Sequence, residues 1–426
     1  MKKVCLFMAL LILIGLAAGC KGRTNDGKVE ITVVTSFGEG DGNHENYVNA
    51  YKAYEQASGH TVNDRSSVTN EAWKKDVILN FDSDNDIDVL FYFTGADADS
   101  LIKNNKVVSI SEIRKHDANY AANMKDSMLP VSAADGRQYS VPVNGYWEGL
   151  YVNKKVLADC GVNVPGSDYS WDQFLTDCSI IKNKGYTPIA CSLNEIPHYW
   201  FEFCTFNHGT MSNHAILPAG ASDEIGAIWS EGFNDMKVLY EKGFFPQDTT
   251  TISDQQANFL MTENKAAFML DGSWKLGWFQ TNASDINDFT VTYVPAKGER
   301  KATDIVGGMS MGYYITKRAW DDPDKRQACI DFVTAMTTDE VVNTFGALSI
   351  TALKNGTKLP GNADALVKDA LKMTKGCTGI VLAVQDGLNP TARDMLFNDV
   401  KNIVTGKTTP QKAIDHCLAI KEETGG

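Results

Sequence analysis

Short apolar runs and segments of helical periodicity alternate over the first hundred residues of this chain. Residues 31–35 and 87–93 have the apolar and aromatic character of buried strands, and residues 61–62 resume a short strand between them. Apolar side chains recur every three to four positions over residues 47–57 and 73–81, which predicts two helices. The order strand, helix, strand, helix, strand favours an α/β fold with a mostly parallel sheet that helices cover on both faces.

The length and charge of the chain narrow the classes of protein it can belong to. With 426 residues, it is longer than one hydrophobic core usually serves, so two domains are expected. Its net charge is −13, and basic clusters are missing. An acidic chain of this kind is a poor partner for nucleic acid or anionic lipid. We therefore expect no nucleic-acid partner.

The N-terminus has the pattern of an export signal. Two lysines precede an apolar run over residues 4–18, which ends in Leu16-Ala17-Ala18-Gly19-Cys20. Small residues followed directly by cysteine resemble a bacterial lipobox, in which the cysteine is lipidated. We predict a signal peptide at 1–19, lipidation of Cys20, and a tether over 20–28 that holds the protein at the outer face of the cell membrane. The alternative is an ordinary cleaved signal with a chance cysteine.

Seven cysteines remain beyond Cys20, and their scattered spacing is not a disulfide framework. One bridge within the group from Cys160 to Cys204 stays possible, and its pairing is open. Zinc, redox, metalloprotease and phosphate-loop motifs are all missing, so we expect no metal and no cofactor. Gly308-Met309-Ser310-Met311-Gly312 matches a hydrolase nucleophile elbow by letter, but the sequence predicts a strand after it, where that motif requires a helix. We expect no catalytic residues.

Six landmarks spread along the chain follow the order found in one family. They are Ile31–Ser36, Asn153–Phe174, Gly185–Ala190, Lys265–Trp274, Gly307–Met336 and Gly406–Ala413. The second contains Trp171-Asp172-Gln173-Phe174, where Ser170 and Gln173 predict a helix capping box. The chain resembles the extracellular solute-binding proteins of family 1, the maltose-binding-protein-like carbohydrate receptors of ABC importers. It departs from the family's pattern at Asn264, where a glycine is usual.

This resemblance implies a two-lobe periplasmic-binding-protein-like fold with a ligand cleft between the lobes. The N-terminal lobe would comprise 29–144 and 313–347, and the C-terminal lobe 145–312 and 348–426. Three hinge crossings would lie near 142–147, 308–313 and 347–352. The family captures a sugar by closing the lobes and docks on membrane permease subunits. A monomer with a carbohydrate ligand, an ABC-importer permease and a bilayer anchor as partners is therefore expected.

Several side chains at segment ends are candidates for the ligand site. A sugar site needs carboxylates that accept hydrogen bonds from hydroxyls and aromatic faces that cover a pyranose ring. Tyr146 and Trp147 are adjacent, so they face opposite ways on a strand and one of them should contact ligand. The candidates are Phe37, Glu39, Asp41, Tyr92, Thr94, Tyr146, Trp147, Glu148, His198, Trp200, Asp271, Trp274, Gly308 and Met309.

Two other functions remain open on the sequence alone. A surface lipoprotein that hydrolyses glycosidic bonds would use the same residue types, because that reaction needs two carboxyl groups on either side of one bond. A receptor of the same fold could also bind a peptide, a polyamine or a metal instead of a sugar. The order of the landmarks favours the carbohydrate receptor.

Overall fold

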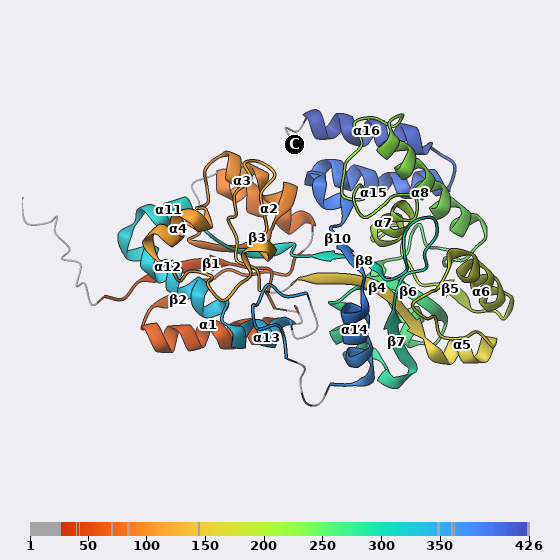
Figure 1. Cartoon of the computed structure of the whole chain (residues 1–426), viewed down its shortest axis with the longest axis horizontal. Coiled ribbons are helices and arrows are strands. Elements are labelled where there is room, and N and C mark those ends of the chain that lie inside the picture. The colour runs from red at the N-terminus through yellow and green to blue at the C-terminus, as the bar shows by residue number, and fades with distance from the viewer. Residues whose placement is uncertain are drawn as a thin grey trace, which may run out of the picture.

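The computed structural model describes residues 27–39, 41, 43–69, 71–82, 86–143, 145–346, 350–358, 361 and 363–423. The predicted signal peptide, Cys20 and most of the predicted tether lie outside the described residues. The chain forms two lobes side by side, each built on its own sheet (Figure 1). The predicted two-lobe α/β fold is confirmed.

The N-terminal lobe contains a four-stranded sheet in the order β2-β1-β3-β9. The first three strands are parallel, and β9 runs antiparallel to β3. Ile31 and Val33 face one hydrophobic cluster, and Val34 faces another on the opposite side of the sheet. Burial on both faces explains the continuous apolar character of residues 31–34 and 89–93. The strands are β1 (Glu30–Val34), β2 (Thr61–Asp64), β3 (Val89–Phe93) and β9 (Met311–Ile315).

Helices cover both faces of this sheet. On one face α1 and α12 pack together, and the Tyr54 hydroxyl donates a 2.9 Å hydrogen bond to the carbonyl of Ala328. On the other face, α2 and α3 contribute Val77, Phe81 and Leu101 to the core. The elements are α1 (His44–Ser58), α2 (Glu71–Asp82), η1 (Gly95–Ala98), α3 (Asp99–Lys103), α4 (Ile110–His116), η2 (Asp126–Met128), α11 (Lys317–Asp321), α12 (Pro323–Met336) and α13 (Asp339–Gly346).

The C-terminal lobe is built around one long central strand. This strand, β4, pairs with β8 near its start, with β7 near its end and with β6 along most of its length, all antiparallel. The sheet order is β10-β8-β4-β6-β5. Its strands are β4 (Tyr146–Asn153), β5 (Thr187–Ile189), β6 (Ala266–Gly272), β7 (Phe289–Thr292), β8 (Asp304–Gly308) and β10 (Gly379–Val381).

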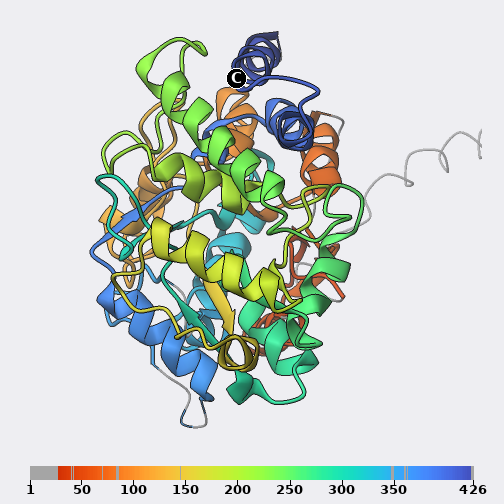
Figure 2. The same ribbon diagram turned by 90° about the vertical axis from the view of Figure 1, so that its right-hand side faces the viewer.

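Helices cover the outer side of this lobe, which faces the viewer in Figure 2. Side chains on β4 alternate between two cores: Tyr146 and Leu150 join one, and Trp147 and Tyr151 join the other. The elements are α5 (Lys154–Cys160), α6 (Trp171–Asn183), α7 (His198–Phe206), α8 (Glu224–Glu241), α9 (Asp254–Thr262), α10 (Lys275–Asn282), η3 (Ile286–Asp288), α14 (Ala365–Gly376), η4 (Val384–Gly387), α15 (Pro390–Val404) and α16 (Pro410–Glu423).

Only one of the two hydrogen bonds of the capping box predicted at the start of α6 is present. Ser170 accepts a 3.2 Å hydrogen bond from the backbone N–H of Gln173, as predicted. The Gln173 amide does not return to the cap, because it donates to Asp177 one turn along the helix at 2.8 Å. A complete capping box forms instead at the start of α9, between Ser253 and Gln256.

The chain passes between the lobes at three places. The first two crossings run from Val143 to Tyr146 and from Gly308 to Met311, close to where the sequence predicted them. The third lies later than the predicted 347–352, because Ala352 and Leu353 are buried in the core of the N-terminal lobe. The C-terminal lobe resumes at Asp364, which caps α14.

Ser310 lies in the second crossing, between β8 and β9. A nucleophile elbow needs a strand before the serine and a helix after it, so the Gly308–Gly312 segment does not have that geometry. The seven cysteines of the described residues are all free, and six are buried. Within the described part of the chain, no helix is both long and apolar enough to cross a bilayer.

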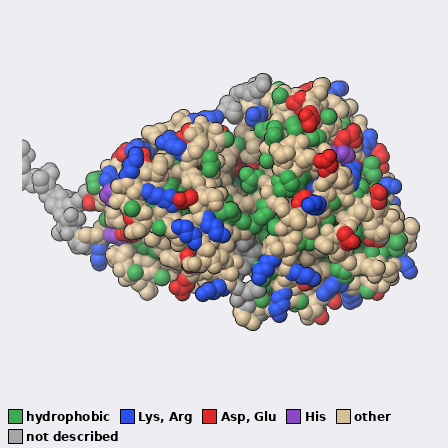
Figure 3. Space-filling view, viewed as in Figure 1, with side chains coloured by type: hydrophobic (Ala, Val, Ile, Leu, Met, Phe, Trp, Pro, Cys, Tyr) green, Lys and Arg blue, Asp and Glu red, His purple; other side chains and the backbone are tan. Residues whose placement is uncertain are grey.

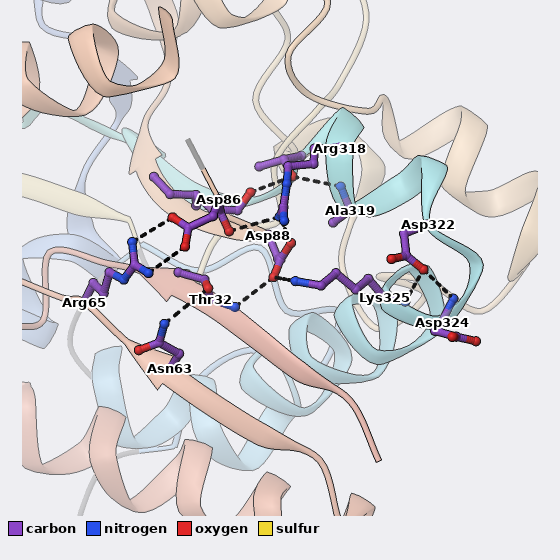
Figure 4. Close-up of polar contacts among 12 residues, drawn as sticks. Thr32, Asn63, Arg65, Asp86, Asp88, Arg318, Ala319, Asp322, Asp324 and Lys325 are labelled. Atoms are coloured by element: carbon purple, nitrogen blue, oxygen red, sulfur yellow. Dashed lines mark hydrogen bonds and ion pairs between the residues drawn. The ribbon is translucent and has the colours of Figure 1, made fainter. Parts of the chain in front are cut away.

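A buried carboxylate joins the sheet of the N-terminal lobe to its helices (Figure 4). Asp88, which is fully buried, accepts hydrogen bonds from the backbone of Thr32 at 2.9 Å, from Arg318 at 2.6 Å and from Lys325 at 2.5 Å. Asp86, two residues earlier, pairs with Arg65 nearer the surface. Since Thr32 is on β1 and the two cations come from α11 and α12, Asp88 links three elements.

Candidate ligand cleft

A cleft of about 1790 Å³ lies between the two lobes. The space-filling view shows the furrow that separates them (Figure 3). One end of the cleft is formed by α2 and α15, at the top of Figure 1, and the other by α13 and α14, at the bottom. Loops that follow β1 and β6 line it between these ends, where strand ends of an α/β sheet commonly present ligand-binding groups.

The C-terminal lobe lines the cleft with a row of aromatic rings. Trp274 is 49% exposed, and its ring centroid lies 6.3 Å from that of Tyr146 and 5.8 Å from that of Tyr199. The indole lies against Gly272, where an added methyl group would come within 2.2 Å of the ring. Only glycine lets the indole approach the strand this closely, so Gly272 makes room for a half-exposed aromatic face.

The aromatic row continues toward α15. His198 packs on Tyr199 at 4.2 Å and stacks on Phe397 at 4.5 Å with an angle of 12° between the rings. Burial, with smaller contributions from the nearby Arg393 and Lys74, lowers the pKa of His198 to about 3. The imidazole is therefore neutral at physiological pH, when one ring nitrogen can donate and the other accept a hydrogen bond.

Two carboxyl groups, the buried Glu148 and the partly buried Asp386, lie beside the aromatic row. Glu148 is 1% exposed on β4, and its Oε2 has no hydrogen-bond partner among the described residues. Burial raises its pKa well above the ordinary value, and the neighbouring Glu202 and Asp386 raise it further. Burial likewise raises the pKa of Asp386 to about 6, an effect that Arg393 opposes. Among the described residues the Glu148 Oε2 thus has no partner, while Asp386 has only the guanidinium of Arg393 at 3.8 Å, so both carboxyl groups are suited to bind polar groups of a ligand.

The N-terminal lobe forms the opposite wall. Phe37 lines the cleft and packs at 4.7 Å on Phe91 and at 4.9 Å on Phe345. Asp41 accepts a 2.8 Å hydrogen bond from the backbone of Asn43, and burial raises its pKa. This wall therefore combines apolar rings with partly buried carboxyl groups, Asp41 and Asp339 on α13.

Six of the predicted site residues line the cleft: Phe37, Asp41, Tyr146, Glu148, His198 and Trp274. Of the adjacent pair at the start of β4, Tyr146 faces the cleft and Trp147 is fully buried in the opposite core. Strand alternation requires that the two side chains face opposite ways. Of the two, Tyr146 is therefore the one for which ligand contact is predicted.

Besides Trp147, seven other predicted residues are not part of the cleft lining. Tyr92 is fully buried and donates a hydrogen bond to the carbonyl of Lys74, and Trp200 is buried against Phe174. The Thr94 hydroxyl donates to the carbonyl of Met309 at 3.2 Å. The remaining residues are the exposed Glu39, the buried Asp271, and Gly308 next to Met309 in the second crossing. On β3, the neighbours of Tyr92, Phe91 and Phe93, line the cleft instead.

Asp271 has a structural role next to the cleft. It accepts a 2.7 Å hydrogen bond from the backbone of Gly272, and its other oxygen lies 3.3 Å from Lys275. Burial raises its pKa from 3.8 to about 6, while Lys275 opposes this shift. The carboxyl group thus holds the turn that carries Trp274.

Sequence reasoning missed several lining residues that come from the end of the chain or from helices. They include Lys74, Tyr199, Gln385, Asp386, Arg393 and Phe397. Tyr199 had a signal, since it lies between two predicted residues in an aromatic stretch. The others had none, because their place in the cleft depends on how α2, η4 and α15 pack across the lobes.

Comparison with known proteins gives one family and many similar folds. Residues 49–375 match the family model of bacterial extracellular solute-binding proteins. A chitin oligosaccharide binding protein superposes with a TM-score of 0.78 at 20% identity, covering 93% of this chain and 98% of that one. No curated protein matches the sequence.

Two further solved structures have a similar fold at lower identity. Maltose-bound MalE3 of T. maritima superposes with a TM-score of 0.71 at 15% identity, over 93% of this chain and all of the other. The GacH receptor of Streptomyces glaucescens, which was solved unliganded and with acarbose, superposes with a TM-score of 0.72 at 17% identity, over 93% of this chain and 98% of the other. At these identities the likeness concerns the fold.

Proposed function

Since the chain belongs to the bacterial extracellular solute-binding proteins, we propose that it is the carbohydrate receptor of an ABC importer. It captures a sugar or oligosaccharide outside the cytoplasm and delivers it to permease subunits in the membrane. The single observation that carries this proposal is the half-exposed face of Trp274, which packs against Gly272 and is continued by Tyr146 and Tyr199. Aromatic faces of this kind cover the apolar face of a sugar ring.

The carboxyl groups of the cleft supply the polar half of such a site. Glu148 and Asp386 lie on the C-terminal wall, and Asp41 lies on the N-terminal wall. Each of them can form hydrogen bonds with the hydroxyl groups of a sugar, because an ionised carboxylate accepts such bonds and a protonated carboxyl group also donates one. Aromatic surface and acceptors from both lobes favour a ligand that is apolar on its ring faces and polar around its edge.

The proposal is tested by a thermal-shift screen followed by calorimetry. The panel contains malto-, cello-, xylo- and chito-oligosaccharides, with peptides and polyamines as the alternative ligand classes. A ligand that binds only the folded state raises the melting temperature. Chromatography of the bound sugar then separates receptor from hydrolase. Recovery of unchanged sugar supports the receptor, and release of shorter products contradicts it. A shift with peptides or polyamines alone would contradict a carbohydrate ligand.

We also propose that the mature protein is a monomer held at the membrane by a lipid on Cys20. The support is the apolar run that ends in Leu16-Ala17-Ala18-Gly19-Cys20. Cys20→Ser removes the lipid attachment point, so the variant should appear in the soluble extracytoplasmic fraction while wild type stays with membranes in carbonate washes. Wild type and variant that fractionate alike would contradict the anchor.

A further inference from the structure

Contacts between the lobes close the cleft at the end formed by α2 and α15. Asp97 on η1 accepts a 2.6 Å hydrogen bond from Arg393 on α15, and both side chains are only 3% exposed. Lys75 on α2 and Asp394 on α15 form a second ion pair across the lobes, nearer the surface. A bound chain cannot pass through this end while these pairs are in place.

The backbone also closes this end. The short helices η1 and η4 meet across the lobes, and a methyl group added to Gly95 would lie 3.2 Å from the carbonyl oxygen of Asp386. At the opposite end, around α13 and α14, no ion pair between described residues joins one lobe to the other. The two ends of the cleft are therefore unlike.

The closed end of the cleft is lined by polar groups of the kind that bind the end of a sugar chain. Gln385 is 7% exposed, and its Oε1 accepts no hydrogen bond from any described residue. Asp386 follows it, and the Lys74 ammonium lies 3.8 Å from the ring centroid of Phe93 on the facing wall. A buried amide oxygen without a donor is unfavourable unless a ligand supplies one. The terminal unit of a sugar chain carries a hydroxyl that inner units have lost to the glycosidic bond.

Resting on the proposed function, we infer that the α2–α15 end is a terminal subsite that receives one end of an oligosaccharide, with Gln385 as acceptor for the last sugar unit. The rest of the chain extends past Trp274 toward α13 and α14. The cleft, at about 1790 Å³, exceeds the roughly 300–1,000 Å³ of pockets for drug-sized ligands, which leaves room for several units.

The experiment compares ligand lengths and ligand ends. Calorimetry measures the affinity of wild type and Gln385→Leu for a series from disaccharide to hexasaccharide of the glycan with the largest thermal shift. Gln327→Leu, an exposed position on α12, is the matched control. Hexasaccharides with a bulky fluorophore at the reducing end or at the non-reducing end test the blocked end, and a cyclic oligosaccharide of the same linkage tests the need for any end.

A terminal subsite predicts that Gln385→Leu weakens every member of the series about tenfold or more, including the disaccharide, because every ligand occupies it. One tagged hexasaccharide keeps its affinity, while the other and the cyclic ligand lose it. Equal binding of both tagged ligands, tight binding of the cyclic ligand, or an effect of Gln385→Leu on long members alone overturns the terminal subsite and leaves the receptor in place. If no glycan binds at all, the proposed function fails and the subsite with it. Unchanged melting of the unliganded variants shows that they fold.

Discussion

Two tryptophans that the sequence placed in the same candidate site should respond to truncation in opposite ways. Trp147 is fully buried, so Trp147→Ala is expected to lower the free energy of unfolding by about 3–5 kcal/mol. Trp274 is half exposed on the cleft, so Trp274→Ala should leave stability nearly unchanged and weaken sugar binding about ten- to a hundredfold. Urea unfolding and calorimetry on both variants measure the two effects. If neither variant loses affinity for the sugar, the site lies elsewhere in the cleft.

Single residues also show where sequence reasoning reaches its limit. Alternation on a strand predicted that Tyr146 and Trp147 would face opposite ways, and they do. The sequence could not tell which one faces the cleft, since that depends on which side of β4 the N-terminal lobe lies. The same limit explains Tyr92, which is one position away from the lining residues Phe91 and Phe93.

The raised pKa of Asp271 predicts a pH dependence of stability. Burial raises that pKa from 3.8 to about 6. Below about pH 4 the folded and unfolded states both hold the proton; between about pH 4 and 6 only the folded state does. Stability from this group is therefore complete at low pH and falls as the pH rises through that window, by up to about 3 kcal/mol.

Asp271→Asn removes this titration and isolates it from other carboxyl groups. The unfolding free energy of the variant relative to wild type should increase between pH 4 and pH 7, as measured by urea unfolding at both values. Parallel pH profiles for the two proteins would mean that Asp271 has an ordinary pKa in the folded state.

At the scale of elements, Asp88 and Asp86 offer a matched pair of carboxylates. Asp88 is fully buried and bonded to β1, α11 and α12, so Asp88→Ala leaves the Thr32 N–H without its acceptor and separates three elements. We expect a loss of about 3 kcal/mol in unfolding free energy. Asp86 is half exposed in its pair with Arg65, so Asp86→Ala should lose at most about 1 kcal/mol. If urea unfolding gives equal losses of unfolding free energy for the two variants, burial does not determine how much each carboxylate contributes to stability.

Element types followed from the sequence because they depend on local periodicity. The apolar spacing predicted α1 and α2, and the apolar runs predicted β1 and β3. Finer features depended on neighbours that the sequence does not place together. The sequence allows the Gln173 side chain to cap α6, but in the structure its amide donates a hydrogen bond to Asp177, one turn along the helix. The third crossing was placed too early because Ala352 and Leu353 pack back into the first lobe.

For the whole molecule, the ion pair between Asp97 and Arg393 should bias the lobes toward the closed arrangement. Removing the carboxylate leaves a buried guanidinium without its partner across the lobes, so Asp97→Ala should favour separated lobes. Small-angle scattering of the unliganded variant should then give a larger radius of gyration than wild type. Saturating ligand should compact both proteins, because the ligand contacts both lobes.

The same variant should also bind its ligand more weakly, since part of the binding free energy is used to close the lobes. Asp99→Ala is the matched control: Asp99 lies two residues away and pairs with Lys103 inside the N-terminal lobe. It should change neither the radius nor the affinity. If Asp97→Ala scatters like wild type and binds equally tightly, the buried pair joins two surfaces that stay together for other reasons. In that case the angle between the lobes is set by the three crossings, together with the 2.6 Å hydrogen bond that the backbone N–H of Gly145, in the first crossing, donates to the carbonyl of Ile350.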